Sequence, residues 1–203
     1  MNKLSLNELE AVALQAFQNE AESVSATAKA LSIPEFSDAA YAIATAERIA
    51  TCGCGHSGIA CAHFAHLLCC VERPSRFLPP SEAVHGGLGF VKENDVMVLA
   101  SRGGETDELL PIIDICRTKK AVIIAVTENL SSSLAKRSDI VLPMKVTREC
   151  DKYNSQGTAS FVALSAIFDA LQAAVIEITG YNNHQFALIH PNGAVGKRLN
   201  RTK

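Results

Sequence analysis

Apolar and polar residues follow two different patterns along the chain, and the change falls near residue 47. In the first 47 residues, apolar side chains recur at a helical spacing, as at Leu9, Val12, Leu14 and Phe17. Pro34 breaks this pattern. We therefore predict one helix before the proline and a second helix that begins near Ser37.

After residue 47, five short runs, most of them containing β-branched residues, alternate with helical patterns. The runs are RIATC (48–52), SRFL (75–78), DVMVLA (95–100), AVIIAV (121–126) and DIVLPM (139–144). The helical patterns cover about 59–71, 105–118, 131–137 and 156–179. Continuously apolar strands separated by helices are typical of a parallel sheet with helices on both faces. The sequence predicts a doubly wound α/β domain with a sheet of about five strands.

The chain has 203 residues, which suits a single domain. We expect an N-terminal helical segment at 1–47 and an α/β core at 48–203. The net charge of -2 gives no reason to expect nucleic acid or an anionic membrane as a partner. No apolar run reaches the roughly 18 residues of a membrane span, and Glu8 and Glu10 interrupt the N-terminus, so we expect a cytoplasmic protein.

Seven cysteines are an odd number, and most lie in or beside apolar segments. This usage favours reduced thiols that fill a core over a disulfide framework. Cysteines and histidines do gather in one region: Cys52, Cys54, His56, Cys61, His63, His66, Cys69 and Cys70. Their spacing lacks the clear ligand pairs of a zinc site, so we expect no metal there.

The stretch TCGCGHSG (51–58) contains G-x-G-x-x-G after the first predicted strand. In a doubly wound sheet, ligands bind beyond the carboxyl ends of the strands, where such turns lie. Three interpretations are open: a dinucleotide site, a site for another phosphate, and a purely structural tight turn. A dinucleotide site needs an acidic residue at the end of the second strand, but SRFL is followed by no acid before Glu82.

A second turn, ASRGGETDELL (100–110), follows the third predicted strand. It places Ser101, Arg102, Gly104 and Thr106 where a strand ends and a helix begins. Free backbone N–H groups and hydroxyls at such a point form an anion site. The two turns side by side would hold one phosphate from two directions.

These turns and three later stretches resemble the sugar isomerase (SIS) domain, and most of all the arabinose-5-phosphate isomerases. The matching stretches are GCGHSG (53–58), SEAVHGGLG (81–89), SRGGETDELLPII (101–113), VTENLSSSLAKRSDIVLPMKVTREC (126–150) and FALIHPNGAVGKRL (186–199). The resemblance implies a three-layer α/β/α sandwich, assembled as a homodimer or homotetramer. It also implies interconversion of an aldose phosphate and its ketose isomer without a cofactor.

The resemblance also implies roles for particular residues. The catalytic positions match Glu108, Glu149 and His190, and the family's catalytic lysine falls on His56. The substrate-binding positions are Gly55, Ser57, His85, Ser101, Arg102, Gly104, Glu105 and Thr106. Isomerisation needs a base that takes a proton next to the carbonyl and polar groups that steady the enediol, and carboxylates and histidines suit both tasks.

Each catalytic candidate also has an ordinary interpretation. Glu108 could favour the dipole of a helix that begins at 105. Glu149 could be a solvated charge in a loop, and His190 a surface histidine in a turn before Pro191.

The sequence departs from the family in several places. Histidine as a residue type can gain or lose its charge near neutral pH, whereas lysine stays charged, so His56 removes a permanent charge from this position. Arg102 could compensate as a bidentate phosphate ligand, although Gly103 removes one hydroxyl. Pro79 and Pro80 stand where a second histidine could precede His85, and the paired CBS modules of longer relatives are not expected. An isomerase, a sugar-phosphate sensor and a dinucleotide enzyme remain as hypotheses, in that order.

Overall fold

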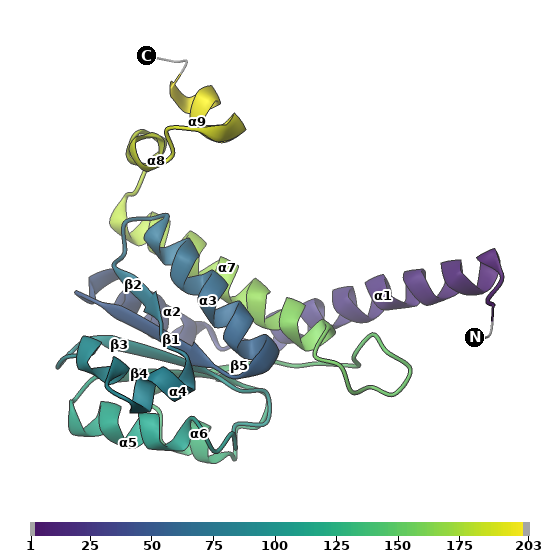
Figure 1. The fold of residues 1–203 in the computed structure, drawn as a ribbon, viewed down its shortest axis with the longest axis horizontal. Coiled ribbons are helices and arrows are strands. Elements are labelled where there is room, and N and C mark those ends of the chain that lie inside the picture. Colours follow the sequence, from purple (N-terminus) through teal and green to yellow (C-terminus); the bar gives the residue numbers. More distant parts are fainter. Residues whose placement is uncertain (1–2, 201–203) are drawn as a thin grey trace.

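The computed structural model describes residues 3–200, and a five-stranded parallel sheet forms its centre (Figure 1). The strands are β1 (Ile49–Gly53), β2 (Ser75–Phe77), β3 (Val96–Ala100), β4 (Val122–Thr127) and β5 (Ile140–Pro143). All neighbouring strands are parallel, in the order β2-β1-β3-β4-β5. All five strands predicted from the sequence are therefore confirmed, within one or two residues at their ends.

Helices cover both faces of the sheet, so the domain has three layers (Figure 1). Along β3, Val96, Val98 and Ala100 join the core under one helical layer, while Met97 and Leu99 join the core under the other. This alternation follows from the two-residue period of a strand, and it explains why a strand buried on both faces is continuously apolar. The predicted α/β/α architecture is confirmed.

The first helical layer contains α2 (Ile33–Thr45), α3 (Gly55–Cys69) and α7 (Ala159–Thr179). The second contains α4 (Pro80–Val84), the 3-10 helix η1 (Gly87–Phe90), α5 (Leu110–Thr118) and α6 (Ser133–Lys136). The chain continues from α7 into α8 (Asn183–Ile189) and α9 (Gly193–Asn200), which stand apart from both layers (Figure 1).

Several helix boundaries differ from the prediction. The two predicted helices are present, but the break between them falls at 31–32 and the second helix begins at Ile33, earlier than Ser37. Pro34 fits in the first turn of α2 because an N–H at that position would have no partner within the helix. The helix predicted over 105–118 begins only at Leu110, with Pro111 in its first turn. The short η1 and α4 and the C-terminal α8 and α9 were not predicted.

Helix α1 (Leu6–Ala30) has two halves with different surroundings. Its C-terminal half buries three polar residues, Asn19, Ser23 and Thr27, spaced four apart on one face. The Asn19 amide donates to the carbonyl oxygen of Glu149, and Thr27 Oγ1 donates to that of Lys145. This face of α1 therefore contacts the segment 145–149, which follows β5 and is not part of the sheet.

The N-terminal half of α1 projects from the domain as an arm (Figure 1). Its large apolar side chains are exposed: Leu6, Leu9, Val12, Leu14 and Phe17. Phe17 alone is 72% exposed. The helical prediction for this segment is confirmed, and its apolar side chains are uncovered within this chain.

Helix α7 is long and apolar enough to span a membrane by composition, with a mean hydropathy of 1.8 over its most apolar window. Its packing gives another reason for that composition. Leu164, Ile167, Phe168 and Leu171 all lie in the core beneath the first helical layer, and the Phe168 ring stacks on Phe64 of α3. The helix is apolar because it is the central helix of that layer.

The order of the strands reverses between β1 and β3, so the turns that follow these two strands are neighbours. Two glycines let the first turn pack closely. A Cβ on Gly58 would lie 2.6 Å from the carbonyl oxygen of Gly53, and a Cβ on Gly53 would lie 3.0 Å from the Gly58 nitrogen. The first and last glycines of the G-x-G-x-x-G pattern therefore have a packing role.

We expect Gly58→Ala to lower the free energy of unfolding by about 1–3 kcal/mol, because its methyl group would meet backbone that cannot move aside. Gly103→Ala is the matched control, since a Cβ there meets nothing within 4 Å. Urea unfolding of both variants checks this. Equal stability of the two variants would contradict the packing role.

Candidate active site

A cavity of about 490 Å³ opens where the turn after β1 meets the end of β2. It is lined by Gly53, Cys54, Gly55, Gly58, Ile59, Ala62, Phe77, Pro79, Pro80, Ser81 and Glu108. Two of the predicted site residues, Gly55 and Glu108, belong to this lining. The cavity lies at the carboxyl ends of the strands, as expected for a doubly wound sheet.

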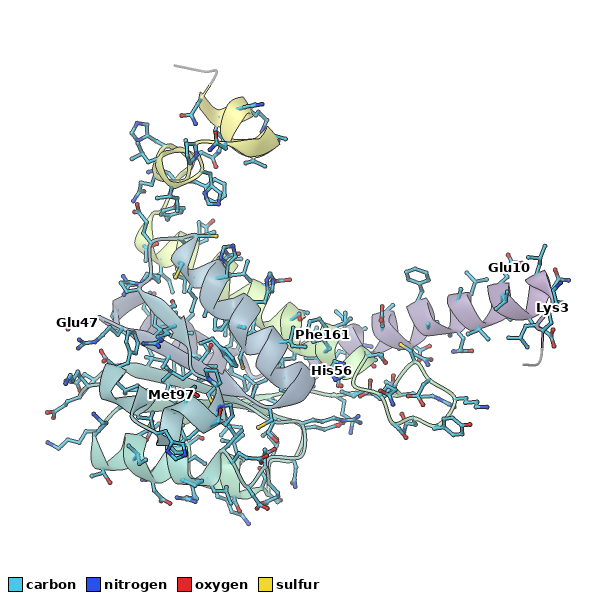
Figure 2. The ribbon with its side chains drawn as sticks, in the orientation of Figure 1. Lys3, Glu10, Glu47, His56, Met97 and Phe161 are labelled. Carbon is cyan, nitrogen blue, oxygen red and sulfur yellow. The ribbon has the colours of Figure 1, made fainter. Side chains whose placement is uncertain are left out.

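The turn after β1 leads directly into α3. Gly55 has a φ of +54°, a left-handed conformation that favours glycine. His56 is exposed, and its ring packs edge-on against Phe161 at the start of α7, with the ring centroids 6.5 Å apart (Figure 2). Ser57 is half-buried in the first turn of α3. The backbone N–H groups at this helix start face the strand ends, where an anion is favoured.

The turn after β3 is held together by its own hydroxyl groups. Ser101 Oγ and Thr106 Oγ1 lie 2.8 Å apart, and the Gly104 N–H donates to Ser101 Oγ. Gly104 has a φ of +69° and packs against Ser132, the residue that caps α6. The structure thus brings the three predicted ligands Ser101, Gly104 and Thr106 together in one preformed loop.

The acidic residues of this turn precede α5 and do not lie within it, which corrects the prediction that Glu105 and Glu108 occupy a first helical turn. The Glu105 carboxylate accepts a hydrogen bond from the Ser133 N–H and so caps α6. Glu108 is exposed and lines the cavity. Burial, and then the charge of Glu108, raise the pKa of the Cys54 thiol, which places that carboxylate beside the β1 turn.

Glu149 is only 1% exposed, so it is not the solvated loop charge of the ordinary interpretation. Its Oε2 accepts from the N–H groups of Thr158 and Ser160 at the start of α7, at 2.9 and 3.1 Å. Its Oε1 accepts from Arg102 Nη1 at 2.7 Å. Burial by itself raises the pKa of this carboxyl, but these hydrogen bonds and the Arg102 charge outweigh burial and lower the pKa.

The depressed pKa predicts an acid-dependent stability. A carboxyl with a lowered pKa in the folded state stabilises the fold above its ordinary pKa of 4.5, and that contribution is lost as pH falls through the lower folded value. We expect Glu149→Gln to be less stable than the native chain at pH 7, with a difference that shrinks towards pH 3. Urea unfolding at several pH values measures this, with the exposed Glu108→Gln as control. A difference that does not depend on pH would contradict it.

Arg102 was predicted to bind phosphate, and two of its nitrogens are engaged by carboxylates. Besides Glu149, it donates from Nε to Glu128 Oε2 at 2.9 Å. Glu128 follows β4 and was not among the predicted site residues. No short motif marks it, because its partner lies 26 positions away in the sequence.

His190 lies far from this cavity within the same chain. Its Nδ1 lies 3.2 Å from the Phe186 carbonyl oxygen, and its ring stacks on the Phe186 ring. Its Nε2 lies 4.0 Å from the thiol of Cys70, at the C-terminal end of α3. Gly55 is at the other end of that helix, about 22 Å away at 1.5 Å per residue. His85 is exposed at the end of α4, which begins at the cavity wall.

The cysteines are all free, and Cys52, Cys61 and Cys116 are buried in the core. Burial raises the pKa of Cys52 to about 12. Within residues 3–200, no group of three or more histidine, cysteine or acidic side chains is arranged to hold a metal ion.

Comparison with known proteins identifies the family. The SIS domain model matches residues 42–177, which is most of the α/β core. The chain belongs to the SIS domain family. Among solved structures, the SIS domain here is similar to a candidate sugar-phosphate isomerase from Listeria monocytogenes, with a TM-score of 0.90 and 38% identity. That likeness covers 94% of this chain and 100% of the other.

Two further relatives bear on substrate. An Escherichia coli CFT073 protein, c3406, whose structure is a complex with arabinose 5-phosphate, is 27% identical with a TM-score of 0.87, over 93% of this chain and 100% of that one. The arabinose 5-phosphate isomerase KpsF of Escherichia coli is 37% identical over 72% of this chain. This SIS domain spans only 46% of the length of that isomerase.

Proposed function

We propose that this chain is an aldose–ketose isomerase that interconverts arabinose 5-phosphate and ribulose 5-phosphate. Membership of the SIS family and similarity to arabinose 5-phosphate isomerases support a sugar-phosphate isomerase. The observation that carries the proposal is the position of Glu108: an exposed carboxylate in the cavity wall, beside a preformed loop of hydroxyl and N–H groups.

The phosphate would bind between the two turns. The helix start at Gly55–Ser57 offers backbone N–H groups, and the other turn offers Ser101 and Thr106. Because these groups are fixed before any ligand arrives, little ordering is needed on binding. The sugar would then extend into the cavity, where Glu108 can move a proton between carbons 1 and 2 of the enediol.

Of the other catalytic candidates, His190 would come from a second subunit. His190 is about 22 Å from Gly55 by the length of α3, so it cannot reach the β1 turn of its own chain, where the phosphate would bind. The uncovered apolar face on the arm of α1 supports a homodimer or homotetramer, since large exposed apolar patches usually mark interfaces. In such an assembly, His190 of one copy would complete the site of another. A cytoplasmic location stays a prediction from composition.

Sugar specificity tests the proposal. Arabinose 5-phosphate, ribose 5-phosphate, glucose 6-phosphate and unphosphorylated arabinose are each incubated with the protein, and ketose formation is followed by NMR. We expect turnover of arabinose 5-phosphate and none of free arabinose. Turnover of a hexose phosphate alone would show that the proposed substrate is wrong and the reaction class is right. No turnover of any sugar would contradict the proposed isomerase activity.

The second candidate is a sensor that binds sugar phosphate without turnover. One observation favours it: His56 stands at the position of the family's lysine and packs against Phe161. A raised melting temperature with arabinose 5-phosphate, in a protein that shows no turnover, would establish the sensor.

A further inference from the structure

We propose that Arg102 positions the Glu149 carboxylate and supplies a fixed positive charge beside it. In this role, Arg102 does not bind the substrate phosphate. This inference rests on the proposed function for its catalytic meaning. Its structural part concerns the ionisation of one buried carboxylate and can be tested without turnover.

The first argument is geometric. Arg102 is fixed at both ends: its carbonyl oxygen accepts from Thr127 Oγ1 and from the Glu128 N–H, and its guanidinium spans two carboxylates. The distances are 2.7 Å to Glu149 and 2.9 Å to Glu128. A guanidinium suits this arrangement because its donors form a rigid planar fork.

The second argument concerns the two oxygens of Glu149. Oε2 is surrounded by three donors, namely the N–H groups of Thr158 and Ser160 and the Thr158 hydroxyl. Oε1 accepts only from Arg102 among the described residues. A carboxylate oxygen has two lone-pair positions, so the free position lies on Oε1. Arg102 therefore sets the direction in which Glu149 could exchange a proton.

The third argument is charge balance. Glu149 and Glu128 carry two negative charges, and Arg102 contacts both. Lys145 also reaches Glu128, at 3.6 Å, but its side chain is 62% exposed and it does not contact Glu149. Removing one partner of a buried ion pair leaves the other charge uncompensated. Without Arg102, the nearly inaccessible Glu149 would keep its hydrogen bonds from Thr158 and Ser160 but lose the only cation that contacts it among residues 3–200.

Other titratable groups lie near this network. Glu128 after β4 shares Arg102 with Glu149. Glu20 of α1 contacts Cys150, and His56 of α3 packs against Phe161 of α7. Arg148, Cys150 and Asp151 lie within two positions of Glu149 in the sequence. Of these, Glu128 is tied to Glu149 through Arg102, so its removal is also informative. Without the Glu128 charge, the Arg102 guanidinium would interact with the Glu149 carboxylate alone and stabilise its ionised form more strongly.

The experiment titrates the Glu149 carboxyl by carbon-13 NMR, with the resonance assigned from its loss in Glu149→Gln. We expect Arg102→Met to move the titration midpoint to higher pH, Arg102→Lys to return it towards the native value, and Glu128→Gln to lower it. Lys145→Met, which also removes a cation from the network, should leave it unchanged. An unchanged midpoint in Arg102→Met, or a raised one in Glu128→Gln, overturns the inference.

Kinetics provide the second readout. If Glu149 acts as a second acid–base group beside Glu108, it must be ionised to accept a proton. In Arg102→Met, kcat for arabinose 5-phosphate should then fall by about tenfold or more at pH 6 and recover at higher pH. A rise in KM alone would instead mark Arg102 as a phosphate ligand and overturn the positioning role. If the native protein turns over no sugar phosphate, the proposed function fails while the titration still decides the inference. If Arg102→Met does not fold, Arg102→Lys and Glu128→Gln decide it.

Discussion

Glu108→Gln should abolish most of the isomerase activity, lowering kcat by about 10²–10⁴-fold, the usual contribution of a general acid–base group. The amide has nearly the same shape but cannot accept and return a proton at neutral pH. Folding should be unaffected, because the Glu108 side chain is exposed and makes no hydrogen bond with any of residues 3–200. Turnover of arabinose 5-phosphate and thermal melting of the variant measure both expectations.

Asp107→Asn is the matched control for this prediction. Asp107 is an exposed acid in the same turn, and it does not line the cavity. Its substitution should change kcat less than about twofold, because an exposed charge outside the cavity acts on the site only through a weak, salt-screened electrostatic interaction. Equal losses in the two variants would mean that charge in the turn matters and that Glu108 has no specific role.

Mixing two inactive variants should restore activity. A homodimer of Glu108→Gln lacks the base, and a homodimer of His190→Ala lacks the histidine. If each site combines Glu108 of one subunit with His190 of another, a mixed dimer has one intact site. Equal mixing with exchange of subunits should then restore about a quarter of native activity, because half of the dimers are mixed and half of their sites are complete.

A double variant provides the control for the mixing experiment. Equal mixing of Glu108→Gln/His190→Ala with native protein should lower the activity of the native subunits to about half, because half of the dimers become mixed and a mixed dimer has no complete site. Absence of restored activity in the first mixture, with subunit exchange shown by mass spectrometry, would place His190 outside the active site.

The central strands β1, β3 and β4 could be predicted from the sequence because each is a short, mostly apolar run that is almost wholly buried. The edge strand β2 is only partly buried, and its place between helical patterns was the signal. Helix starts were harder to predict. The start of α5 was placed too early because polar residues such as Glu105 continue the helical pattern, although Pro111 was a readable signal of a later start. Helix α8 also has a readable signal, the capping box of Asn182 and Gln185.

The two turns of the site could be predicted because glycines and hydroxyl residues in a short stretch indicate a turn that binds an anion. The contacts in the network around Glu149 could not be predicted from the sequence. Arg102 contacts Glu149 across 47 positions and Glu128 across 26, and no local pattern reports such pairs. The C-terminal half of α1 also contacts this segment, since Asn19 donates to the Glu149 carbonyl oxygen across 130 positions. Those contacts come from tertiary packing alone.

Solvent exchange tests the central claim most directly. The native protein and Glu108→Gln are incubated with ribulose 5-phosphate in deuterated water, and the sugar is followed by NMR. We expect the native protein to form arabinose 5-phosphate and to place deuterium at carbon 1 or 2, and we expect Glu108→Gln to do neither. Binding of the sugar phosphate by the native protein, without deuterium uptake over several hours, would contradict the isomerase and leave a sensor.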